Sequence, residues 1–151
     1  MAKKSIYLAH PISLNSADAV FTYYDNLTNM LKDKFTVFSP MYAKNILRTE
    51  RQFRASGYDD NPITTNHAIF ERDTWMVNQS DIVLCDLTDA TNVSIGCCME
   101  LAIASWLHKH TIVVMEKENI HQHAFILESA DIVFENIDDA LIYLDDLCKG
   151  K

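Results

Sequence analysis

The sequence predicts an α/β fold in which parallel strands alternate with helices. Short apolar runs rich in β-branched residues recur along the chain, and such runs are typical of buried strands. Longer segments with apolar residues at helical spacing lie between them. Strands that alternate with helices give a parallel sheet covered on both faces. We therefore expect a doubly wound, five-stranded parallel sheet of the Rossmann or flavodoxin-like type.

The chain opens with a predicted strand and a long helix. The strand covers residues 5–9 and stops before Pro11, because proline disfavours helical backbone in the residue that precedes it. The helix that follows runs to about residue 34. Three side chains can cap its start: Ser13, Asn15 and Ser16. Its apolar residues are spaced for one buried face: Phe21, Tyr24, Leu27, Met30 and Leu31.

A second strand and an irregular stretch come next. Residues 35–38 form the strand, which Pro40 terminates. From residue 41 to 65 the pattern weakens to a short helix at 43–53 and a loop rich in Asp, Asn, Gly and Pro. An irregular stretch of this length in a compact domain is often a substrate lid, and we interpret it as one.

The centre of the chain holds the stretch around which the rest is organised. Asn66 can cap a helix over residues 67–79, which leads into a buried strand at 81–88. After a polar gap, Ser94 can cap a mostly buried helix that extends to Trp106. In open α/β sheets ligands bind at the carboxyl ends of strands, so this strand-to-helix connection is the expected site.

The C-terminal part completes the predicted sheet. A fourth strand covers residues 111–115, and a polar connection covers 116–127. A fifth strand at 131–134 and an amphipathic helix at 137–147 follow. Because no repeat or linker interrupts the chain, we expect residues 1–151 to form a single domain.

Composition and charge narrow the function classes. The chain has 151 residues and a formal net charge of −8, which argues against sequence-independent binding of a nucleic acid polymer or an anionic membrane. A small anionic ligand is still compatible, because a helix N-terminus can hold a phosphate. No apolar run has the length of a membrane span, and the N-terminus lacks the apolar core of a signal peptide. The cysteines fit no metal spacing and indicate free thiols in a reducing cytoplasm, so we expect a cytoplasmic protein.

Several common site motifs are absent. The sequence has no Gly-x-Gly-x-x-Gly, no phosphate loop with its lysine and no Gly-x-Ser-x-Gly. The histidine pairs at 108–110 and 121–123 are too closely spaced for a helix-face metal site. These absences disfavour a dinucleotide enzyme, a nucleoside triphosphatase and an α/β-hydrolase, and we expect neither a cofactor nor a metal.

Carboxylates are the first candidates for chemistry. Glu100 and Asp73 lie on helices whose ends should meet near the carboxyl edge of the sheet. One carboxylate can attack a sugar carbon while another carboxyl protonates the leaving group. Alternatively, Glu100 anchors a neighbouring group and Asp73 pairs with an arginine at the surface. Tyr7 either holds Glu100 or simply packs in its strand, and Asp86 either faces the site or caps the turn at Thr88.

Together these residues resemble the nucleoside 2-deoxyribosyltransferase family in its broad sense, including its nucleoside 5′-monophosphate N-glycosidases. Residues 6–9 match the opening strand of the family. The family also has a helix that carries an aspartate and leads into a strand beginning with Asp, and Asp73 through Asp81 match this part. Its most specific motif is an Asp or Ser, a Gly two residues on, and Glu-Leu four residues after that glycine. The matching residues here are Ser94, Gly96, Glu100 and Leu101. The resemblance covers residues 5–134.

The resemblance implies a role for each of these residues. Glu100 would attack the anomeric carbon to give a glycosyl-enzyme intermediate, and Tyr7 would hold it in place. Asp73 would position the nucleoside or assist protonation of the departing base. Water as the acceptor gives a hydrolase, and a second base gives a transferase. Family members are typically homo-oligomers with shared active sites, so His123 would contact the substrate of a neighbouring subunit.

Position 94 separates two branches of the family. Relatives that use free nucleosides carry Asp there, and relatives that hydrolyse 5′-monophosphates carry Ser, so Ser94 favours a nucleotide. The phosphate-using relatives have a Gly-Ser-Ile-Arg-like first turn, which this chain replaces with His10-Pro11-Ile12-Ser13. Either His10 and Ser13 bind the phosphate in place of that turn, or the substrate is a free nucleoside. Gly96 and Asp86 are the other residues expected to bind the substrate.

These observations lead to three hypotheses about function. Hydrolysis of a (deoxy)nucleoside 5′-monophosphate to free base and sugar phosphate comes first. Base exchange on a free deoxyribonucleoside comes second, and a non-catalytic nucleotide-binding module comes third, because fold alone does not define function. In each case the partners are a small nucleotide or nucleoside and at least one further copy of the chain, as a homodimer or larger homo-oligomer.

Overall fold

The computed structural model describes residues 2–150. Its centre is a sheet in the order β2-β1-β3-β4-β5, in which all neighbouring strands run parallel. The five strands are β1 (Ser5–Ala9), β2 (Thr36–Phe38), β3 (Ile82–Asp86), β4 (His110–Val114) and β5 (Ile132–Phe134). The predicted doubly wound fold with five parallel strands is therefore confirmed.

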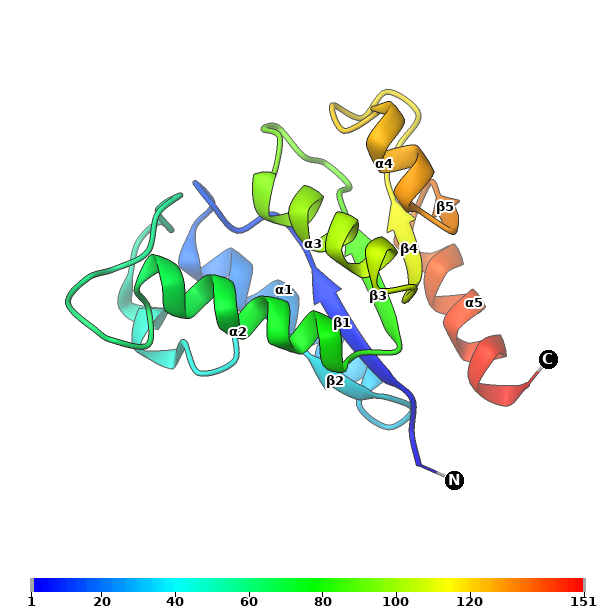
Figure 1. Ribbon diagram of the computed structural model, residues 1–151, viewed down its shortest axis with the longest axis horizontal. Coiled ribbons are helices and arrows are strands. Elements are labelled where there is room, and N and C mark those ends of the chain that lie inside the picture. The colour runs from blue at the N-terminus through cyan, green and yellow to red at the C-terminus, as the bar shows by residue number, and fades with distance from the viewer. Residues whose placement is uncertain (1, 151) are drawn as a thin grey trace.

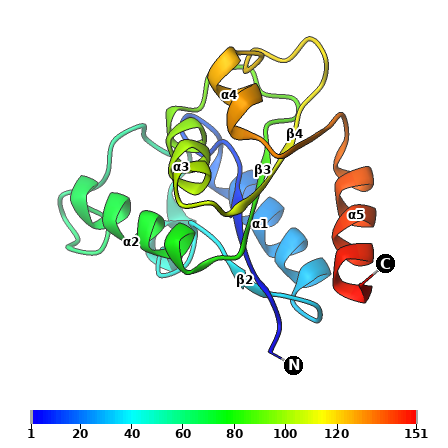
Figure 2. The same ribbon diagram turned by 45° about the vertical axis from the view of Figure 1, so that its right-hand side comes forward.

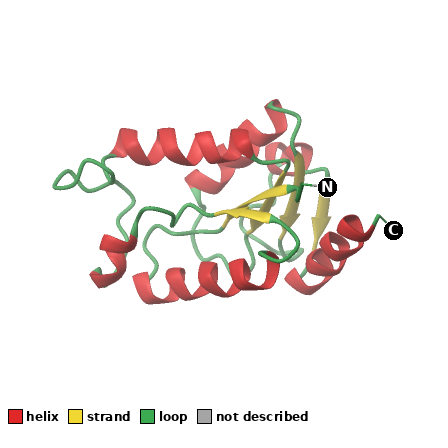
Figure 3. Ribbon diagram, turned by 90° about the horizontal axis from the view of Figure 1, so that it is seen from below, coloured by secondary structure: helices red, strands yellow, loops and turns green. Residues whose placement is uncertain are grey.

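Helices cover both faces of this sheet, as Figures 1 and 3 show. The helices are α1 (Ala17–Leu31), the 3₁₀ helix η1 (Asn45–Thr49), α2 (Asn66–Gln79), α3 (Ile95–Trp106), α4 (Ala124–Ser129) and α5 (Ile137–Lys149). Apolar residues of α1 and α5 pack on one face, and those of α2, α3 and α4 pack on the other. Within residues 2–150, no helix is both long enough and apolar enough to cross a membrane.

The alternation of side chains along the strands decides which residues each helix layer meets. All five residues of β3 are buried. Ile82 and Leu84 point toward α1 and α5, while Val83 and Cys85 point toward α2 and α3. Tyr7 pairs with Val83 across the sheet and therefore faces the same side as α3.

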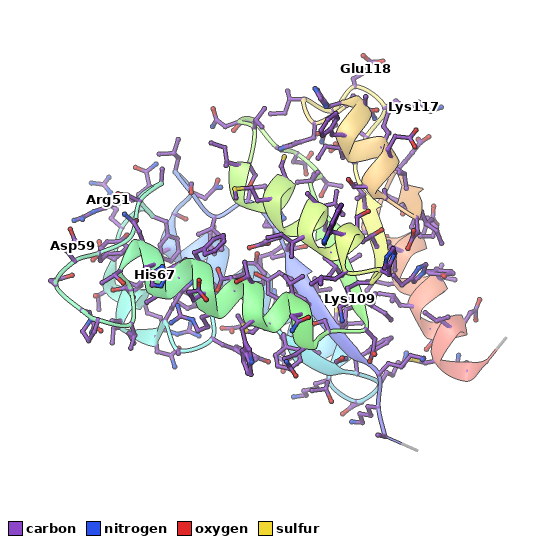
Figure 4. All side chains as sticks on the ribbon, viewed as in Figure 1. Arg51, Asp59, His67, Lys109, Lys117 and Glu118 are labelled. Carbon is purple, nitrogen blue, oxygen red and sulfur yellow. The ribbon has the colours of Figure 1, made fainter. Side chains whose placement is uncertain are left out.

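The strand order reverses between β1 and β3, which is the position where ligands bind in this type of fold. Residues 41–65 flank this position and contain only the short helix η1. The backbone N–H of Leu14 donates to the carbonyl of Phe53 at 2.9 Å, which fixes the segment to the turn after β1. Figure 4 shows Asp59 at the outer end of this segment, away from the sheet.

Several helix boundaries differ from those predicted. The predicted helix at 43–53 shortens to η1, and Thr65 rather than Asn66 caps α2, because the Thr65 hydroxyl accepts from the N–H of Ala68 at 3.2 Å. The α4 helix begins within the stretch predicted to be a polar connection, and it is too short to give a periodic signal. Met30, predicted to be buried, is 60% exposed because it lies beside the buried stripe of α1.

The prediction that the helix after Ser94 is mostly buried is wrong. One stripe of α3 packs on the sheet and consists of Cys97, Leu101 and Ala104. A second stripe with the same spacing is exposed and consists of Ile95, Met99, Ala102 and Trp106. Because both stripes are apolar, the sequence pattern reads as a helix buried all round, although its own chain covers only one side.

Candidate active site

A cavity of about 580 Å³ opens at the carboxyl ends of β1 and β3, within the size range of small-molecule sites. Its wall is built from the turn after β1, the irregular segment 41–65, α2 and the connection from β3 into α3. The segment interpreted as a lid thus supplies one side of the cavity. Six of the predicted site residues line the cavity or its rim: His10, Ser13, Asp73, Ser94, Gly96 and Glu100.

Glu100 lies on α3 at the cavity wall and is held from behind by Tyr7. The Tyr7 hydroxyl, fully buried in β1, donates to Glu100 Oε1 at 3.0 Å. Burial raises the pKa of Glu100 well above its usual range, and the neighbouring Cys97 and Asp73 raise it further. The Tyr7 hydrogen bond and the Lys44 charge lower that pKa and so favour the carboxylate. Burial also raises the pKa of Tyr7, which keeps its hydroxyl protonated as a donor.

Asp73 reaches the same cavity from α2 and is 8% exposed. Its Oδ2 lies 3.5 Å from Lys44 Nζ, and its Oδ1 has no hydrogen-bond partner among residues 2–150. Burial raises the pKa of Asp73, which Lys44 and Arg72 partly offset. The alternative in which Asp73 pairs with an arginine at the surface is therefore wrong, because Asp73 is buried and pairs with a lysine. Lys44 was not predicted, because a lysine in an irregular segment carries no periodic signal.

The connection from β3 to α3 is held by His121, for which the sequence suggested no role other than a disfavoured metal ligand. The backbone N–H of Ser94 donates to His121 Nε2 at 2.9 Å. His121 Nδ1 lies 2.9 Å from Asn119 Oδ1, so the ring proton is on Nδ1. Burial lowers the pKa of His121 and keeps this ring neutral. Ser94 itself caps α3 by accepting from the N–H of Cys97 at 3.3 Å.

The first turn presents His10 and Ser13 to the cavity. The His10 ring stacks on Tyr23 with 3.7 Å between ring centroids, and its Nδ1 donates to the Asp86 carbonyl at 2.8 Å. Burial lowers the pKa of His10, so its Nε2 is an unprotonated acceptor. Gly96 adds open space, because a β carbon there would meet no protein atom within 4 Å.

The structure does not bring the other two predicted substrate-binding residues to this cavity. The Asp86 carboxylate is buried and accepts from the Tyr23 hydroxyl at 2.6 Å and from the N–H and hydroxyl of Thr88 at 3.0 and 2.7 Å. Of its two predicted roles, the structure shows the cap of the turn at Thr88. His123 is exposed and caps α4, where it accepts from the N–H of Phe125 at 3.2 Å. Across residues 2–150, no three His, Cys, Asp or Glu side chains are grouped so as to hold a metal ion.

Comparison with known proteins identifies the class to which this fold and site belong. A family model described as nucleoside 2-deoxyribosyltransferase matches residues 6–141. The chain therefore belongs to the nucleoside 2-deoxyribosyltransferase family, a class of enzymes that act on small nucleosides or nucleotides. The resemblance inferred from the sequence is thereby confirmed. A comparison with curated proteins found no significant match.

Two solved structures share the fold over nearly their whole length. A 2-deoxyribosyltransferase from Leishmania mexicana is similar with a TM-score of 0.59 and 22% identity, covering 93% of this chain and 95% of that one. The CMP N-glycosidase BcmB from Clostridium botulinum is similar with a TM-score of 0.58 and 14% identity, covering 94% of this chain and 98% of that one. At these identities the likeness establishes the fold, and the reaction must be argued from the site.

Proposed function

We propose that the protein hydrolyses the N-glycosidic bond of a (deoxy)nucleoside 5′-monophosphate and releases the free base and the sugar phosphate. The observation that carries this proposal is the Glu100 carboxyl, which Tyr7 holds at the wall of a cavity that also contains Asp73. A partly buried carboxylate with one fixed donor suits attack on an anomeric carbon, because a nearby negative charge stabilises an oxocarbenium-like transition state.

The reaction proceeds in two steps. Glu100 attacks the anomeric carbon as the C–N bond breaks, and the electron pair of that bond leaves with the base. Asp73, whose pKa is raised by burial, supplies the proton that the departing base takes up. Water then attacks the glycosyl-enzyme ester and gives up a proton to the Asp73 carboxylate, which frees the sugar phosphate and regenerates both Glu100 and the Asp73 carboxyl.

The N-terminus of α3 supports a phosphate as part of the substrate. Ser94 at its cap is neutral, so it does not repel an anion as an aspartate would. Backbone N–H groups of the first turn and the helix dipole favour a negative charge at this point. The guanidinium of Arg54, stacked over the Tyr58 ring at 4.5 Å, adds a positive charge to the cavity wall.

Base exchange on a free deoxyribonucleoside is the second candidate, and the first turn favours it. Pro11 removes one backbone donor from this turn, and the turn contains no arginine. The same attack by Glu100 then precedes capture of the sugar by a second base instead of water.

A chromatographic assay for free base distinguishes these functions. The protein is incubated with each common nucleoside and its 5′-monophosphate, with and without a second base. Release from monophosphates without an acceptor is the expected result. New nucleosides formed only with an acceptor would favour the transferase. Tight binding of a nucleoside or nucleotide without release of its base would indicate a non-catalytic binding module.

Replacing Gly96 with alanine tests whether the ligand occupies the space at the start of α3. We expect KM for the monophosphate to rise roughly tenfold, because the added methyl group overpacks the bound state. The Tm should stay the same or rise slightly, since alanine suits a helix better than glycine. Gly57→Ala is the contrasting variant, because its β carbon would lie 2.4 Å from the Thr64 carbonyl oxygen and should lower the Tm. An unchanged KM in Gly96→Ala would place the ligand elsewhere.

We also propose that the protein is a homodimer or larger homo-oligomer, formed through the exposed stripe of α3. Figures 1 and 2 show α3 between α2 and α4 on one face of the molecule. Trp106 is 85% exposed and Phe125 on α4 is 79% exposed, so this face presents large apolar side chains to solvent. His123 borders it beside Phe125, with 5.8 Å between ring centroids. A second copy on this face brings His123 toward the neighbouring active site.

The double variant Met99→Glu and Trp106→Glu tests this interface. We expect the mass from light scattering to fall to that of a monomer, because two buried carboxylates on each side cost several kcal/mol at an apolar contact. Ile142→Glu is the matched control, since Ile142 is 61% exposed but lies on α5, on the opposite face of the sheet. A monomeric unaltered protein, or equal masses for both variants, would contradict the proposed interface and the role of His123.

A further inference from the structure

Among residues 2–150, Lys44 is the one buried cation of the cavity wall that the proposed reaction has not used. It lies just before η1 and is 5% exposed. Burying an ammonium group is costly unless it is paired and hydrogen-bonded. Among residues 2–150 its charged partner is Asp73 Oδ2, at 3.5 Å, which is longer than a strong charge-assisted hydrogen bond. Three N–H donors on Nζ thus face the cavity with one distant acceptor.

The Asp73 carboxyl of this pair also has an unused hydrogen-bonding atom. The buried Oδ1 atom of Asp73 has no hydrogen-bond partner in the part of the chain that the structure describes. The other charges that act on Lys44 are the Glu100 carboxyl and the Arg72 guanidinium. Arg72 donates from Nη1 to the Ile63 carbonyl at 2.8 Å, and its buried Nε and Nη2 have no hydrogen-bond partner among residues 2–150. An acceptor atom of a ligand placed between Lys44 and Asp73 would accept a hydrogen bond from the Lys44 ammonium and, when Asp73 carries its proton, a second one from the Asp73 carboxyl.

The chemistry of the leaving group indicates what that ligand group is. When the glycosidic bond breaks, its electron pair passes to the base and spreads onto a carbonyl oxygen or ring nitrogen conjugated with the glycosidic nitrogen. A fixed donor aimed at such an atom stabilises the charge only as it develops, which lowers the barrier. A lysine ammonium in a water-poor cavity is a strong donor for this purpose.

Building on the proposed function, we propose that Lys44 is a catalytic residue that donates a hydrogen bond to the carbonyl oxygen or ring nitrogen of the departing nucleobase. The C–N bond breaks, its electron pair goes to the base, and Lys44 holds the resulting negative charge. The proton then passes from the Asp73 carboxyl to the base, and the new Asp73 carboxylate pairs with the Lys44 ammonium. The substrate class is a nucleotide whose base carries such an acceptor beside the glycosidic nitrogen.

A change of leaving group tests this role. Lys44→Met keeps the aliphatic stem and removes the donor. The two substrates are a nucleoside 5′-monophosphate that the unaltered protein cleaves and the 4-nitrophenyl glycoside of the same sugar phosphate, whose leaving group needs neither donor nor proton. We expect kcat/KM to fall roughly 10²- to 10³-fold on the nucleotide, as for the loss of a single transition-state donor. The nitrophenyl substrate should lose less than about threefold.

Two further variants serve as controls for Lys44→Met. Lys44→Gln keeps a neutral N–H donor and should show an intermediate loss on the nucleotide, which keeps the test valid if Lys44→Met lowers the Tm. Lys109→Met should leave both rates unchanged, because Lys109 follows α3 and precedes β4, at the amino edge of the sheet away from the cavity (Figure 4).

The outcomes separate this inference from the proposed function. Equal losses on both substrates in Lys44→Met would show that Lys44 only maintains the shape of the site. An unchanged rate on the nucleotide would also overturn the inference and leave the proposed hydrolysis standing. Failure of the unaltered protein to cleave any nucleotide or nitrophenyl substrate would overturn the proposed function, and this inference with it.

Discussion

Replacing Glu100 with glutamine is expected to abolish base release, with kcat reduced by roughly 10³-fold or more. An amide oxygen does not form the glycosyl ester, so the first step of the proposed reaction has no nucleophile. Glutamine keeps the size of the side chain and an oxygen that accepts from the Tyr7 hydroxyl. The loss therefore reports on the chemistry of the carboxylate and not on the shape of the site.

The same substitution should make the protein more stable at neutral pH. Burial raises the pKa of Glu100 in the folded state, so the unfolded chain ionises first as the pH rises above about 4.5. Above that pH the unfolded state binds fewer protons, and the free energy of unfolding falls until the folded carboxyl also ionises. Glutamine does not titrate. Its stabilising effect is therefore absent at about pH 4 and grows as the pH rises toward 7 and above.

Thermal unfolding of the two proteins between pH 4.5 and 8 measures this effect. One pKa unit corresponds to about 1.4 kcal/mol. In a chain of this size about 1 kcal/mol shifts the Tm by roughly 2–4 °C, so a rise of several degrees is expected at pH 7. Glu71→Gln, at an exposed position on α2, is the control for the loss of one carboxylate. A lower Tm for Glu100→Gln, or activity within tenfold of the unaltered protein, would remove Glu100 from its proposed role.

The sheet could be predicted closely from the sequence because its signal is local. Apolar runs such as residues 82–86 are buried on both faces, and that burial needs no information from elsewhere in the chain. Glu100 was also recognisable, because a carboxylate among apolar helical residues needs a partner or a function. Its contact with Tyr7 follows from the parity of the strand, which directs Tyr7 toward α3.

The rest of the site depends on contacts that no local pattern encodes. Lys44 stands in a segment without periodicity, and only the folded chain brings it to Asp73. His121 supports Ser94 across 27 positions of sequence. The exposure of the second stripe of α3 is not encoded locally for a different reason. An apolar residue covered by its own chain and one available to a second chain give the same pattern, so Met99 and Leu101 look alike in sequence.

Asp86→Ala should lower stability far more than it lowers the rate of the chemical step. Asp86 is 2% exposed, and its carboxylate accepts three hydrogen bonds, one from Tyr23 and two from Thr88. Hydrogen bonds to a charged group contribute about 1.5–3 kcal/mol each, and a buried donor left without its partner adds its own cost. A loss of about 3 kcal/mol or more is expected, which lowers the Tm by roughly 6–12 °C.

The effect on activity follows from where those hydrogen bonds lie. Thr88 belongs to the cavity wall, so a looser turn should raise KM by a few-fold, while kcat measured well below the Tm stays close to that of the unaltered protein. Asp86→Asn is the matched control, because its amide oxygen still accepts from Thr88 and its amide nitrogen can donate to the Tyr23 hydroxyl oxygen. Its Tm should lie between the other two. If Asp86→Ala instead kept its Tm and lost kcat, the carboxylate would have to contact the substrate, and the turn would be held by the Thr88 backbone alone.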